Sequence, residues 1–398
     1  MGRERRWLDS PFMEIRDLTT DDLDQVLDAR RRSFGPLGAA DAERWRALVA
    51  PTLPEGRYLG AFLGGRLAAS ARLRRLTQWW HGRPQALAGV AGVIVNPEFR
   101  GRGVGTAIMG ALLERAVEQG SAMSSLYPAT TPIYRSLGYE HTGTLNRVTL
   151  PAEALRAIRP SSEVTLRRMT PADAPEVIEL LGRLHGAARS SGPTSWEERT
   201  WRRWLGEEDD FLYMADDGFA VYRWDKGDLE VDGVHAGSAE TARTLWSLIG
   251  SGSSVAKNVT ANVAPDDPVF WLTRERTREQ ITAIRWMGRV LDVQGAIERR
   301  GYPSGLSLSA VVTVDDTLMA GNSGTWRIDV SGGSGTATST GPTIEGSGAR
   351  LGIGALTALY SGVPAATLRR AGLMAGDDEH DEALDTIFAA TPYSLDYF

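Results

Sequence analysis

The sequence predicts a mixed α/β protein made of three domains in tandem. A strand followed by a capped helix opens at residues 13–34, and a similar strand–helix phrase with the same T-x-x-D cap returns at residues 161–186. Two such openings about 150 residues apart indicate an internal duplication, although two ordinary strand–helix openings could also coincide. From residue 292 onward, Gly/Ser turns separate short alternating strands, which indicates a third domain of α+β type.

Charge, cysteine and histidine content exclude several classes of protein. The net charge of −6 argues against a dedicated nucleic-acid binder, because phosphate binding needs a basic face. The chain contains no cysteine, which excludes disulfides, thiolate metal ligands and a cysteine nucleophile. Its five histidines are scattered without the spacing of a metal motif, so we expect no metal and no nucleic-acid partner.

Residues 1–12 carry positive charges but no apolar run behind them, so they are predicted to be an amino-terminal extension and not a secretory signal. No apolar run reaches the roughly 18 residues that a membrane-spanning helix needs. We therefore expect a cytoplasmic protein without a membrane span.

The expected elements of the first repeat form a sheet with one covering helix. Residues 57–80 read as a hairpin that turns at Gly64-Gly65, and residues 86–95 read as the next strand. Residues 103–120 carry one apolar face at helical spacing, so a helix is predicted there, with Gly120 as its stop. In the third domain we expect a helix starting near residue 292, strands at 306–317 and 324–340, and helices at 353–362 and 365–372.

The most informative stretch is Gly92–Met109, GVIVNPEFRGRGVGTAIM, which reads as strand, turn, Gly-rich loop and helix. Backbone N–H groups and the dipole at such a helix start favour an anion. Arg100 and Arg102 add charged donors. The loop lacks the G-K-[ST] of a P-loop and the G-x-G-x-x-G of a dinucleotide fold. Three glycines lie where the strand passes into the helix: Gly101, Gly103 and Gly105.

Two motifs then occur in a particular order. Arg100-x-x-Gly103-x-Gly105 matches [QR]-x-x-G-x-[GA], the pyrophosphate loop of the GCN5-related N-acetyltransferases (GNAT); a Gly-rich turn without a ligand is the alternative. Tyr134-x-x-x-Gly138-Tyr139 resembles the [FY]-x-x-x-G-[FY] phrase of the same superfamily. Their order and spacing of about 30 residues predict this fold for residues 13–150.

The whole chain resembles the Eis (enhanced intracellular survival) family of N-acetyltransferases. The likeness is carried by Ser33-Phe34, WRALVAP at 45–51, IYRSLGY at 133–139, RTLWSLIG at 243–250 and the terminal aromatic Phe398. The resemblance implies two tandem GNAT-like domains, the second without a usable coenzyme site, followed by a sterol-carrier-protein-like α+β domain. The second repeat has no pyrophosphate-loop phrase, which agrees with this organisation. The expected domains are 13–158, 159–291 and 292–398.

The resemblance also implies an activity and a site. The family acetylates primary amines of aminoglycosides, polyamines and peptides with acetyl-CoA as co-substrate, without a metal, and is typically a homo-hexamer. Carried over by position, the general acid is Tyr134 and the catalytic base is the carboxylate of Phe398. The implied coenzyme contacts are Val93, Ile94, Val95, Arg100, Gly101, Arg102, Gly103, Val104, Gly105, Thr106, Ala129 and Thr130.

This assignment is chemically consistent. The acceptor ammonium must lose a proton before it attacks the thioester, and a carboxylate in a partly desolvated cleft can accept that proton. An isolated α-carboxylate has a pKa of about 3.5, so its site must raise that value. A backbone N–H of Val93–Val95 would stabilise the oxyanion, and Tyr134 would protonate the leaving thiolate.

The acceptor side of the site departs from the family pattern. Gly35 and Pro36 stand where the family has an acidic residue, and Tyr397 replaces its penultimate acid. Ala129 and Thr130 stand where Ser-Glu is common. These departures bear on aminoglycoside acetylation more than on acetyl transfer itself. The expected substrate-binding residues are Phe34, Trp45, Asp396 and Tyr397.

Other interpretations remain open at this stage. Trp79 and Trp80, with Phe34 and Trp45, would line a more apolar acceptor pocket, and plain core packing is the alternative for each ring. The chain as a whole reads as an acetyltransferase, and its alternatives are a lipid- or ligand-binding protein with a vestigial first domain, or an acyltransferase of secondary metabolism with another donor or acceptor. We expect the Tyr397-Phe398 rings to be buried and to hold the end of the chain in the cleft.

Overall fold

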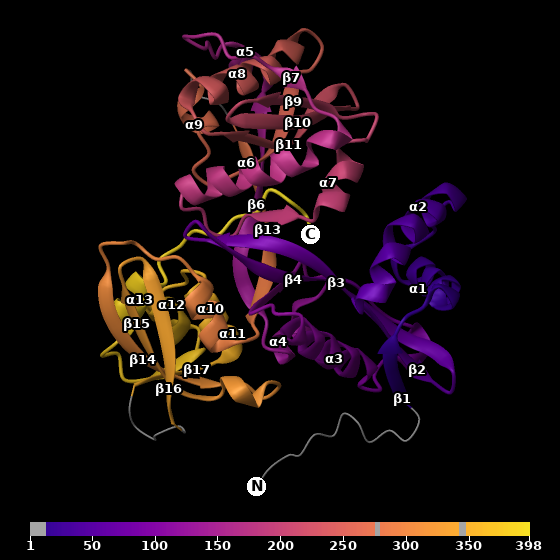
Figure 1. The fold of residues 1–398 in the computed structure, drawn as a ribbon, viewed down its shortest axis with the longest axis vertical. Coiled ribbons are helices and arrows are strands. Elements are labelled where there is room, and N and C mark those ends of the chain that lie inside the picture. Colours follow the sequence, from indigo (N-terminus) through magenta and orange to yellow (C-terminus); the bar gives the residue numbers. More distant parts are fainter. Residues whose placement is uncertain (1–12, 275–278, 342–347) are drawn as a thin grey trace.

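The computed structural model describes residues 13–274, 279–341 and 348–398. The predicted extension, residues 1–12, lies outside the described part. Figure 1 shows three bodies, with the second repeat at the top, the first at the lower right and the Gly-rich region at the lower left. The predicted mixed α/β architecture is confirmed, and we call these bodies the first, second and third domains.

The first domain begins with two helices and continues into a long hairpin. Its elements are β1 (Met13–Asp17), α1 (Leu23–Phe34), α2 (Ala39–Val49), β2 (Tyr58–Leu63), β3 (Arg66–Trp80), β4 (Arg83–Val95), α3 (Val104–Glu118), β5 (Met123–Leu126), α4 (Thr131–Ser136) and β6 (Glu140–Pro151). The hairpin at Gly64-Gly65 and the helix after the Gly-rich loop are therefore confirmed.

The second domain contains α5 (Ala152–Arg156), β7 (Arg167–Arg168), α6 (Ala174–Ala187), β8 (Thr194–Trp196), α7 (Glu198–Trp204), β9 (Phe211–Ala215), β10 (Gly218–Asp225), β11 (Asp228–Ala236), α8 (Ala239–Gly250), β12 (Asn258–Val263), α9 (Val269–Leu272) and β13 (Gln280–Val290). The third domain contains α10 (Val293–Arg299), β14 (Ser307–Asp315), β15 (Gly324–Ser331), β16 (Ser334–Gly341), β17 (Ala349–Gly352), α11 (Ile353–Tyr360), α12 (Ala365–Arg370), β18 (Met374–Gly376) and α13 (Asp381–Ile387).

Both repeats open with the same helix cap. Thr19 and Asp22 form a capping box, in which the Thr19 amide donates to the Asp22 carboxylate at 2.8 Å. Thr170 and Asp173 form the same box, with a distance of 2.6 Å. Each box satisfies two amide groups that a helix start leaves without partners. The repeated T-x-x-D phrase therefore caps the first helix of each repeat.

One sheet of 13 strands runs through the first two domains. Within the described residues its order is β1-β2-β3-β4-β5-β13-β6-β12-β11-β10-β9-β7, with β8 paired to β3. β13 is the last strand of the second domain in the chain, yet it lies between β5 and β6 of the first domain. The long strand β6 pairs with both β13 and β12, and so joins the two halves.

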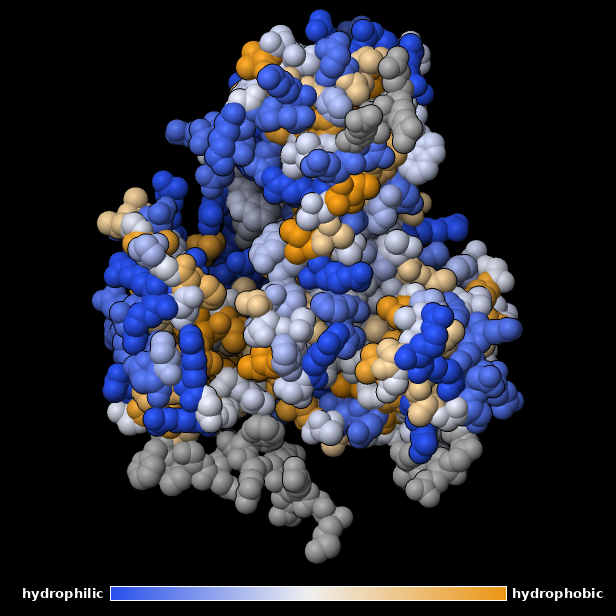
Figure 2. Space-filling view, turned by 180° about the vertical axis from the view of Figure 1, so that it is seen from behind, coloured by the Kyte–Doolittle hydropathy of each residue, from blue (hydrophilic) through white to orange (hydrophobic). Residues whose placement is uncertain are grey.

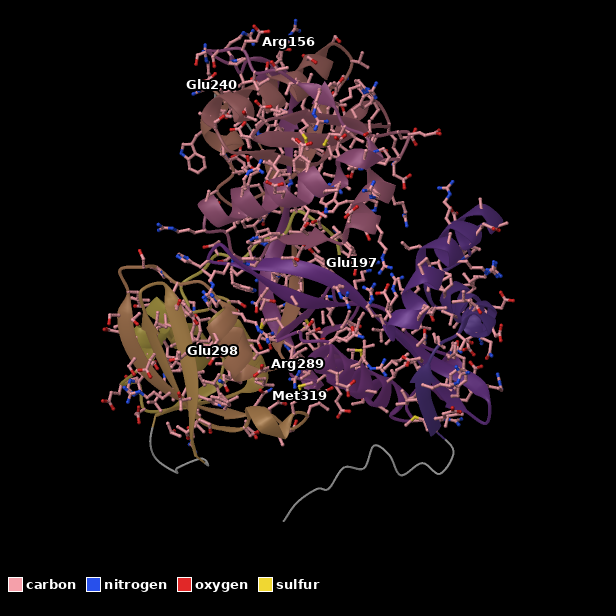
Figure 3. All side chains as sticks on the ribbon, in the orientation of Figure 1. Arg156, Glu197, Glu240, Arg289, Glu298 and Met319 are labelled. Atoms are coloured by element: carbon pink, nitrogen blue, oxygen red, sulfur yellow. The ribbon has the colours of Figure 1, made fainter. Side chains whose placement is uncertain are left out.

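The third domain is a separate five-stranded sheet with the order β16-β15-β14-β17-β18. A buried ion pair ties it to the shared sheet: Nη2 of Arg289 on β13 lies 2.9 and 2.8 Å from the two carboxylate oxygens of Asp316, just after β14. Both side chains are almost completely buried, at 0% and 1% exposure. Figure 3 shows Arg289 at the junction of the two bodies.

The glycine of the second motif is explained by the same arginine. Gly138 follows α4 with a φ of 82°, a left-handed value that glycine adopts at little cost. A Cβ at this position would lie 1.8 Å from Nη1 of Arg289. The motif thus needs a glycine here both for its backbone angle and for the close approach of Arg289.

Trp79 and Trp80 at the end of β3 are core residues. The Trp79 ring packs against His185 of α6 with ring centres 4.9 Å apart. The Trp80 ring packs against Tyr360 of α11 with ring centres 4.8 Å apart. Both are buried, so plain packing, which was the alternative for each, is confirmed for these two rings. They fix the first domain against its two neighbours.

Candidate active site

The strands β4 and β5 separate at the centre of the first domain. They pair in parallel only from Leu87 to Gly89 on β4, whereas β4 itself continues to Val95 against β3. Gly92 has a φ of 60°, and the register between β3 and β4 shifts near it. The edge of β4 beyond Gly89 is therefore not paired with β5, and its peptide groups there can bind a ligand.

The Gly-rich loop lies at the open end of this split. Gly101 and Gly103 have φ values of 72° and 75°, and nothing lies within 4 Å of the space that a side chain would occupy at either. The first N–H groups of α3 lack partners within the helix, as at every helix start. The loop is thus open, unhindered and electropositive, and it fits a diphosphate.

The predicted coenzyme residues flank the split in different ways. Arg100 is exposed, and its Nε donates to the carbonyl of Val95 at 3.2 Å. The guanidinium of Arg102 lies 5.8 Å from the Phe99 ring. Ile94 is buried, at 3% exposure, so only its backbone can face a ligand. Val93, Val104, Gly105, Thr106, Ala129 and Thr130 lie on β4, on the first turn of α3, or just before α4.

Tyr134 projects from α4 into the core that lies under α3. Its ring is 6.0 Å from that of Tyr139, whose hydroxyl bonds to Ser124 at 2.7 Å. Burial raises the pKa of the Tyr134 hydroxyl above its ordinary value. A neutral hydroxyl beside the split is suited to donating a proton.

The last residues of the chain are held against β6 by backbone bonds. The amide of Ser394 donates to the carbonyl of Thr144 at 3.0 Å, and the Thr144 amide donates to the carbonyl of Pro392 at 3.3 Å. Further on, Asn262 donates to the Leu395 carbonyl at 2.9 Å. This end is therefore docked into the shared sheet.

Phe398 lies at the end of β5. Its ring is 5.0 Å from that of Tyr127, which follows β5, and 6.0 Å from that of Trp286 on β13. Phe398 is 4% exposed, as expected, but Tyr397 is 66% exposed and stacks on the outer face of Tyr127 at 4.1 Å. The expected burial of both rings is thus right for Phe398 and wrong for Tyr397, whose ring stacks on Tyr127 and keeps most of its surface in solvent.

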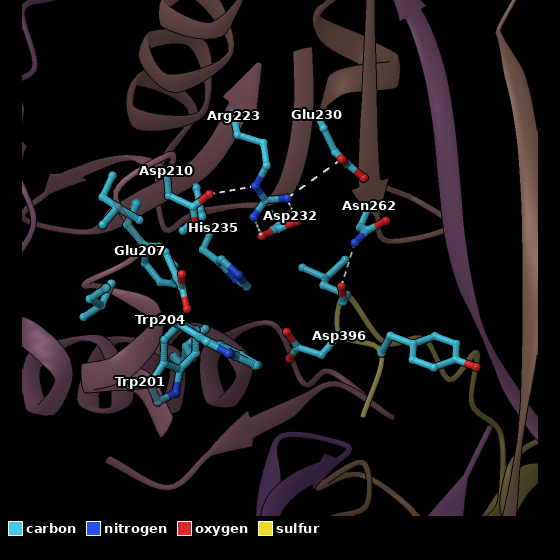
Figure 4. A pocket seen from close by; sticks show the side chains of 18 of the residues that line it. Trp201, Trp204, Glu207, Asp210, Arg223, Glu230, Asp232, His235, Asn262 and Asp396 are labelled. Atoms are coloured by element: carbon cyan, nitrogen blue, oxygen red, sulfur yellow. Dashed lines mark hydrogen bonds and ion pairs between the residues drawn. The ribbon is translucent and has the colours of Figure 1, made fainter. Parts of the chain in front are cut away.

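A cavity of about 430 Å³ opens beside this terminus, on the side of the second domain. Carboxylates predominate among its charged residues (Figure 4). Its arginines are engaged: Arg223 lies 2.7 Å from Asp210 and also pairs with Asp232, and Arg147 pairs with Glu230. The carboxylates that line this acidic pocket are Glu207, Asp210, Glu230, Asp232 and Asp396.

Asp396 is the member of the acidic pocket that the sequence predicted. Burial raises the pKa of its carboxyl to about 7, and the charge of Asp232 contributes to the rise. Thr194 partly offsets the effect by donating to Asp396 at 3.3 Å. Near neutral pH this carboxyl can therefore gain or lose a proton.

The raised pKa of Asp396 gives a testable pH dependence of stability. Because the folded value lies above the ordinary 3.8, the folded protein binds the proton more tightly, and this contribution is lost as pH rises from about 4 to about 7. We expect Asp396→Asn to raise the free energy of unfolding by about 1–3 kcal/mol at pH 8 and to leave it unchanged near pH 4. Urea unfolding at the two pH values measures this, and an equal effect at both would contradict it.

The other predicted acceptor residues lie elsewhere. Phe34 is 58% exposed at the end of α1, and Trp45 packs on Tyr58 with ring centres 6.5 Å apart. Neither lines the acidic pocket. Sequence reasoning missed the second-domain side of this pocket, because its acids are divided between the loop from α7 to β9 and the strand β11, without a motif.

The structure describes residues 13–274, 279–341 and 348–398. No helix there is long and apolar enough to cross a membrane. No group of three or more His, Asp or Glu side chains is arranged there to hold a metal ion.

Three family models match the chain. Residues 14–142 and 192–290 each match an acetyltransferase (GNAT) domain, and residues 293–395 match a sterol carrier protein domain. These matches agree with the order of the three bodies in the structure.

Known proteins give the same result. An uncharacterised N-acetyltransferase of Streptomyces griseus is 30% identical over 338 residues, covering 77% of this chain and 80% of that protein. The N-acetyltransferase Eis of Mycobacterium tuberculosis is 27% identical over 320 residues, covering 70% and 74%.

Among solved structures, a GCN5-related N-acetyltransferase from Kribbella flavida is 43% identical with a TM-score of 0.93, covering 97% of this chain and 98% of that one. Eis1 from Mycobacterium abscessus shares the fold, with a TM-score of 0.75 at 23% identity, and the match covers 97% of this chain and 100% of that one. The chain therefore belongs to the Eis-like GCN5-related N-acetyltransferases and is an acyltransferase.

Proposed function

We propose that this enzyme transfers the acetyl group of acetyl-CoA to a primary amine of a small molecule or peptide by direct attack on the thioester. The observation that carries the proposal is the position of Phe398, held between Tyr127 and Trp286 at the end of β5, beside the split of β4 and β5. In this position its carboxylate is the base for the attacking amine. No covalent acyl-enzyme is needed.

The coenzyme would be held along the split. The N-terminal amides of α3 and the open Gly101–Gly103 loop would bind its diphosphate, with Arg100 and Arg102 as charged donors. The unpaired edge of β4 would bind the pantetheine arm through peptide groups. This arrangement would present the thioester to the middle of the protein, between the first and second domains.

Each chemical step has a candidate group. The Phe398 carboxylate takes a proton from the acceptor ammonium, directly or through water. A backbone N–H of Val93–Val95 stabilises the negative oxygen that forms on the thioester carbon. As the carbon–sulfur bond breaks, Tyr134 donates its proton to the thiolate, and its raised pKa keeps that proton available at neutral pH.

The acidic pocket supports an amine as acceptor. Five carboxylates line it, whereas its two arginines are already paired with three of them. An ammonium group entering beside Asp396, which has no ion-pair partner among the described residues, would find a carboxyl that it can pair with. Polyamines, lysine-like amines and aminoglycosides all carry such a group, and the acceptor is proposed from this class.

The proposal is tested by following thiol release from acetyl-CoA with polyamines, lysine derivatives, aminoglycosides and arylalkylamines, with propionyl-CoA as a second donor. Turnover with at least one amine, with the acetyl group found on nitrogen by mass spectrometry, is the expected result. Thermal stabilisation by acetyl-CoA without turnover on any amine would contradict it.

Tyr134→Phe is expected to lower kcat by about 10²-fold while leaving the affinity for acetyl-CoA nearly unchanged, because only the proton donor is removed. Steady-state kinetics and calorimetric titration measure the two effects. Tyr213→Phe, on β9 of the second domain, is the matched control and should retain full activity. Equal activity of the two variants would argue against an acid role for Tyr134.

A further inference from the structure

A second cavity, of about 300 Å³, lies between the first and second domains. It is bounded by the end of α2, by β3 and by the start of α7, where Glu197 is labelled in Figure 3. Seen from behind, the surface is hollowed between the second domain and the helices α1 and α2, with hydrophilic residues around the hollow (Figure 2). The arginines that line this basic pocket are Arg57, Arg72, Arg74, Arg75, Arg199 and Arg203.

Some of these arginines have carboxylate partners. Arg57 pairs with Glu55 and lies 3.2 Å from Glu197, and Arg199 lies 2.7 Å from each of the same two carboxylates. The remaining two pairs are longer, at 3.9 Å from Arg75 to Glu197 and 3.7 Å from Arg203 to Glu207. Three carboxylates thus serve four arginines.

Arg72 and Arg74 differ from the others. Among the described residues, no carboxylate lies within 4.0 Å of either guanidinium, and neither side chain has a hydrogen bond to a protein group. Their guanidinium groups lie over aromatic rings instead. The distance from Cζ to the ring centre is 6.0 Å for Arg72 and Tyr58, and 5.2 Å for Arg74 and Trp196. Two neighbouring cations therefore point into one cavity without compensating charge.

This arrangement is unfavourable for the protein alone. Burial lowers the pKa of the Arg74 guanidinium to about 9, and the charges of Arg72, Arg30 and Arg203 lower it further. Burial also lowers the pKa of Arg72, with Arg30 and Arg57 contributing. Both residues are half-buried, and a cation that loses part of its water is destabilised unless it is paired. An anion from outside the chain would relieve both the desolvation and the mutual repulsion.

The basic pocket adjoins the proposed reaction centre. Arg72 pairs with Ala91 on β4, two residues before Val93. Tyr397, the neighbour of Phe398, lines both the basic and the acidic pocket, and so does Trp204. The two pockets therefore adjoin each other at Trp204 and Tyr397, and Tyr397 is next to the proposed base in the chain.

We infer that the natural acceptor carries an anionic group, a carboxylate or a phosphate, in addition to its amine, and that Arg72 and Arg74 bind this group. The inference rests on the proposed amine acetylation. A planar guanidinium can bind either anion with two parallel hydrogen bonds. An acceptor with both charges would place its ammonium on the side of Asp396 and its anion on the side of β3. These two arginines would then determine which amines are acetylated.

The test compares matched acceptors on the full-length enzyme. Linear ω-aminocarboxylates of increasing length are compared with their amides, and O-phosphoethanolamine is compared with ethanolamine, which separates a carboxylate from a phosphate preference. The expected kcat/KM is about 10- to 100-fold higher for the anionic member of the preferred pair. In Arg72→Gln/Arg74→Gln this preference should disappear through a higher KM, while the amides or ethanolamine react as before.

Two control variants accompany the double variant. Arg72→Lys/Arg74→Lys keeps the charge and should recover part of the preference. Arg327→Gln, at an exposed position of β15 in the third domain, should change nothing. Calorimetric titration of inorganic phosphate gives a readout that needs no turnover, and we expect binding to the wild type that is lost in the glutamine double variant.

The outcomes separate the inference from the proposed function. Equal rates for charged and neutral acceptors, unaltered by the double variant, overturn the inference and leave amine acetylation standing. No thiol release with any amine overturns amine acetylation, and phosphate binding that depends on Arg72 and Arg74 would still support the anion site. Phosphate binding that is unchanged in the double variant overturns that site. A changed oligomeric mass of the double variant would also overturn it, in favour of a contact between subunits.

Discussion

Extending the chain by three residues after Phe398 is expected to lower kcat by about 10²- to 10⁴-fold, because the α-carboxylate becomes a peptide group and can no longer accept a proton. The Phe398 ring, held beside Tyr127 and Trp286, fixes the point from which the extension starts. The melting temperature should fall only slightly, since the bonds of Ser394 and Leu395 to the sheet are untouched.

The same three residues added at the amino-terminal end are the matched control and should leave kcat unchanged. Removing the carboxyl-terminal extension with a site-specific protease should restore activity. An extended enzyme that turns over at the normal rate would exclude the terminal carboxylate as the base. The acetyl-CoA site would then need another proton acceptor, such as Asp396, whose pKa of about 7 suits that task.

Asp316→Ala is expected to lower the free energy of unfolding by about 3–5 kcal/mol, because it leaves the buried Arg289 guanidinium without its counter-charge. The loss is increased by three donors that also bind this carboxylate, the amides of Leu318 and Met319 and the side chain of Asn322. Denaturant unfolding with tryptophan fluorescence measures the change, since the adjacent β13 carries Trp286.

A matched exposed pair provides the control. Asp329 lies 3.0 Å from Arg327 at the surface of the third domain, and Asp329→Ala should cost less than about 1 kcal/mol. Replacing Arg289 and Asp316 together by Met and Leu should recover part of the lost stability. If Asp316→Ala cost no more than the exposed variant, the pair would not be what fixes the third domain to the sheet.

Local parts of the structure could be predicted from the sequence. The hairpin at Gly64-Gly65, the helix after the Gly-rich loop and the two T-x-x-D caps each depend on residues close together in the chain. Their signals, namely turn glycines, apolar spacing and cap residues, act over a few residues. Tyr134 and the loop residues were found because they lie in contiguous motifs.

The arrangement between distant segments could not be predicted in the same way. Nothing in the residues of β13 indicates that it enters the first domain between β5 and β6. Both pockets combine side chains from the first or second domain with Tyr397 near the end of the chain, so their charges become visible only after folding. Phe34 and Trp45 stay predictions as acceptor residues: they do not line the acidic pocket, and their place in the sequence does not show which side chains a ligand meets.

The insertion of β13 also constrains how this protein can be made. During synthesis the ribosome releases β5 and β6 long before residues 280–290, so both strands must wait with open edges that invite mispairing. A fragment that stops after the first repeat would keep those edges permanently. The two repeats are therefore not separable, and the proposed acetyl-transfer site, which combines the first domain with Phe398, forms only when nearly the whole chain is present.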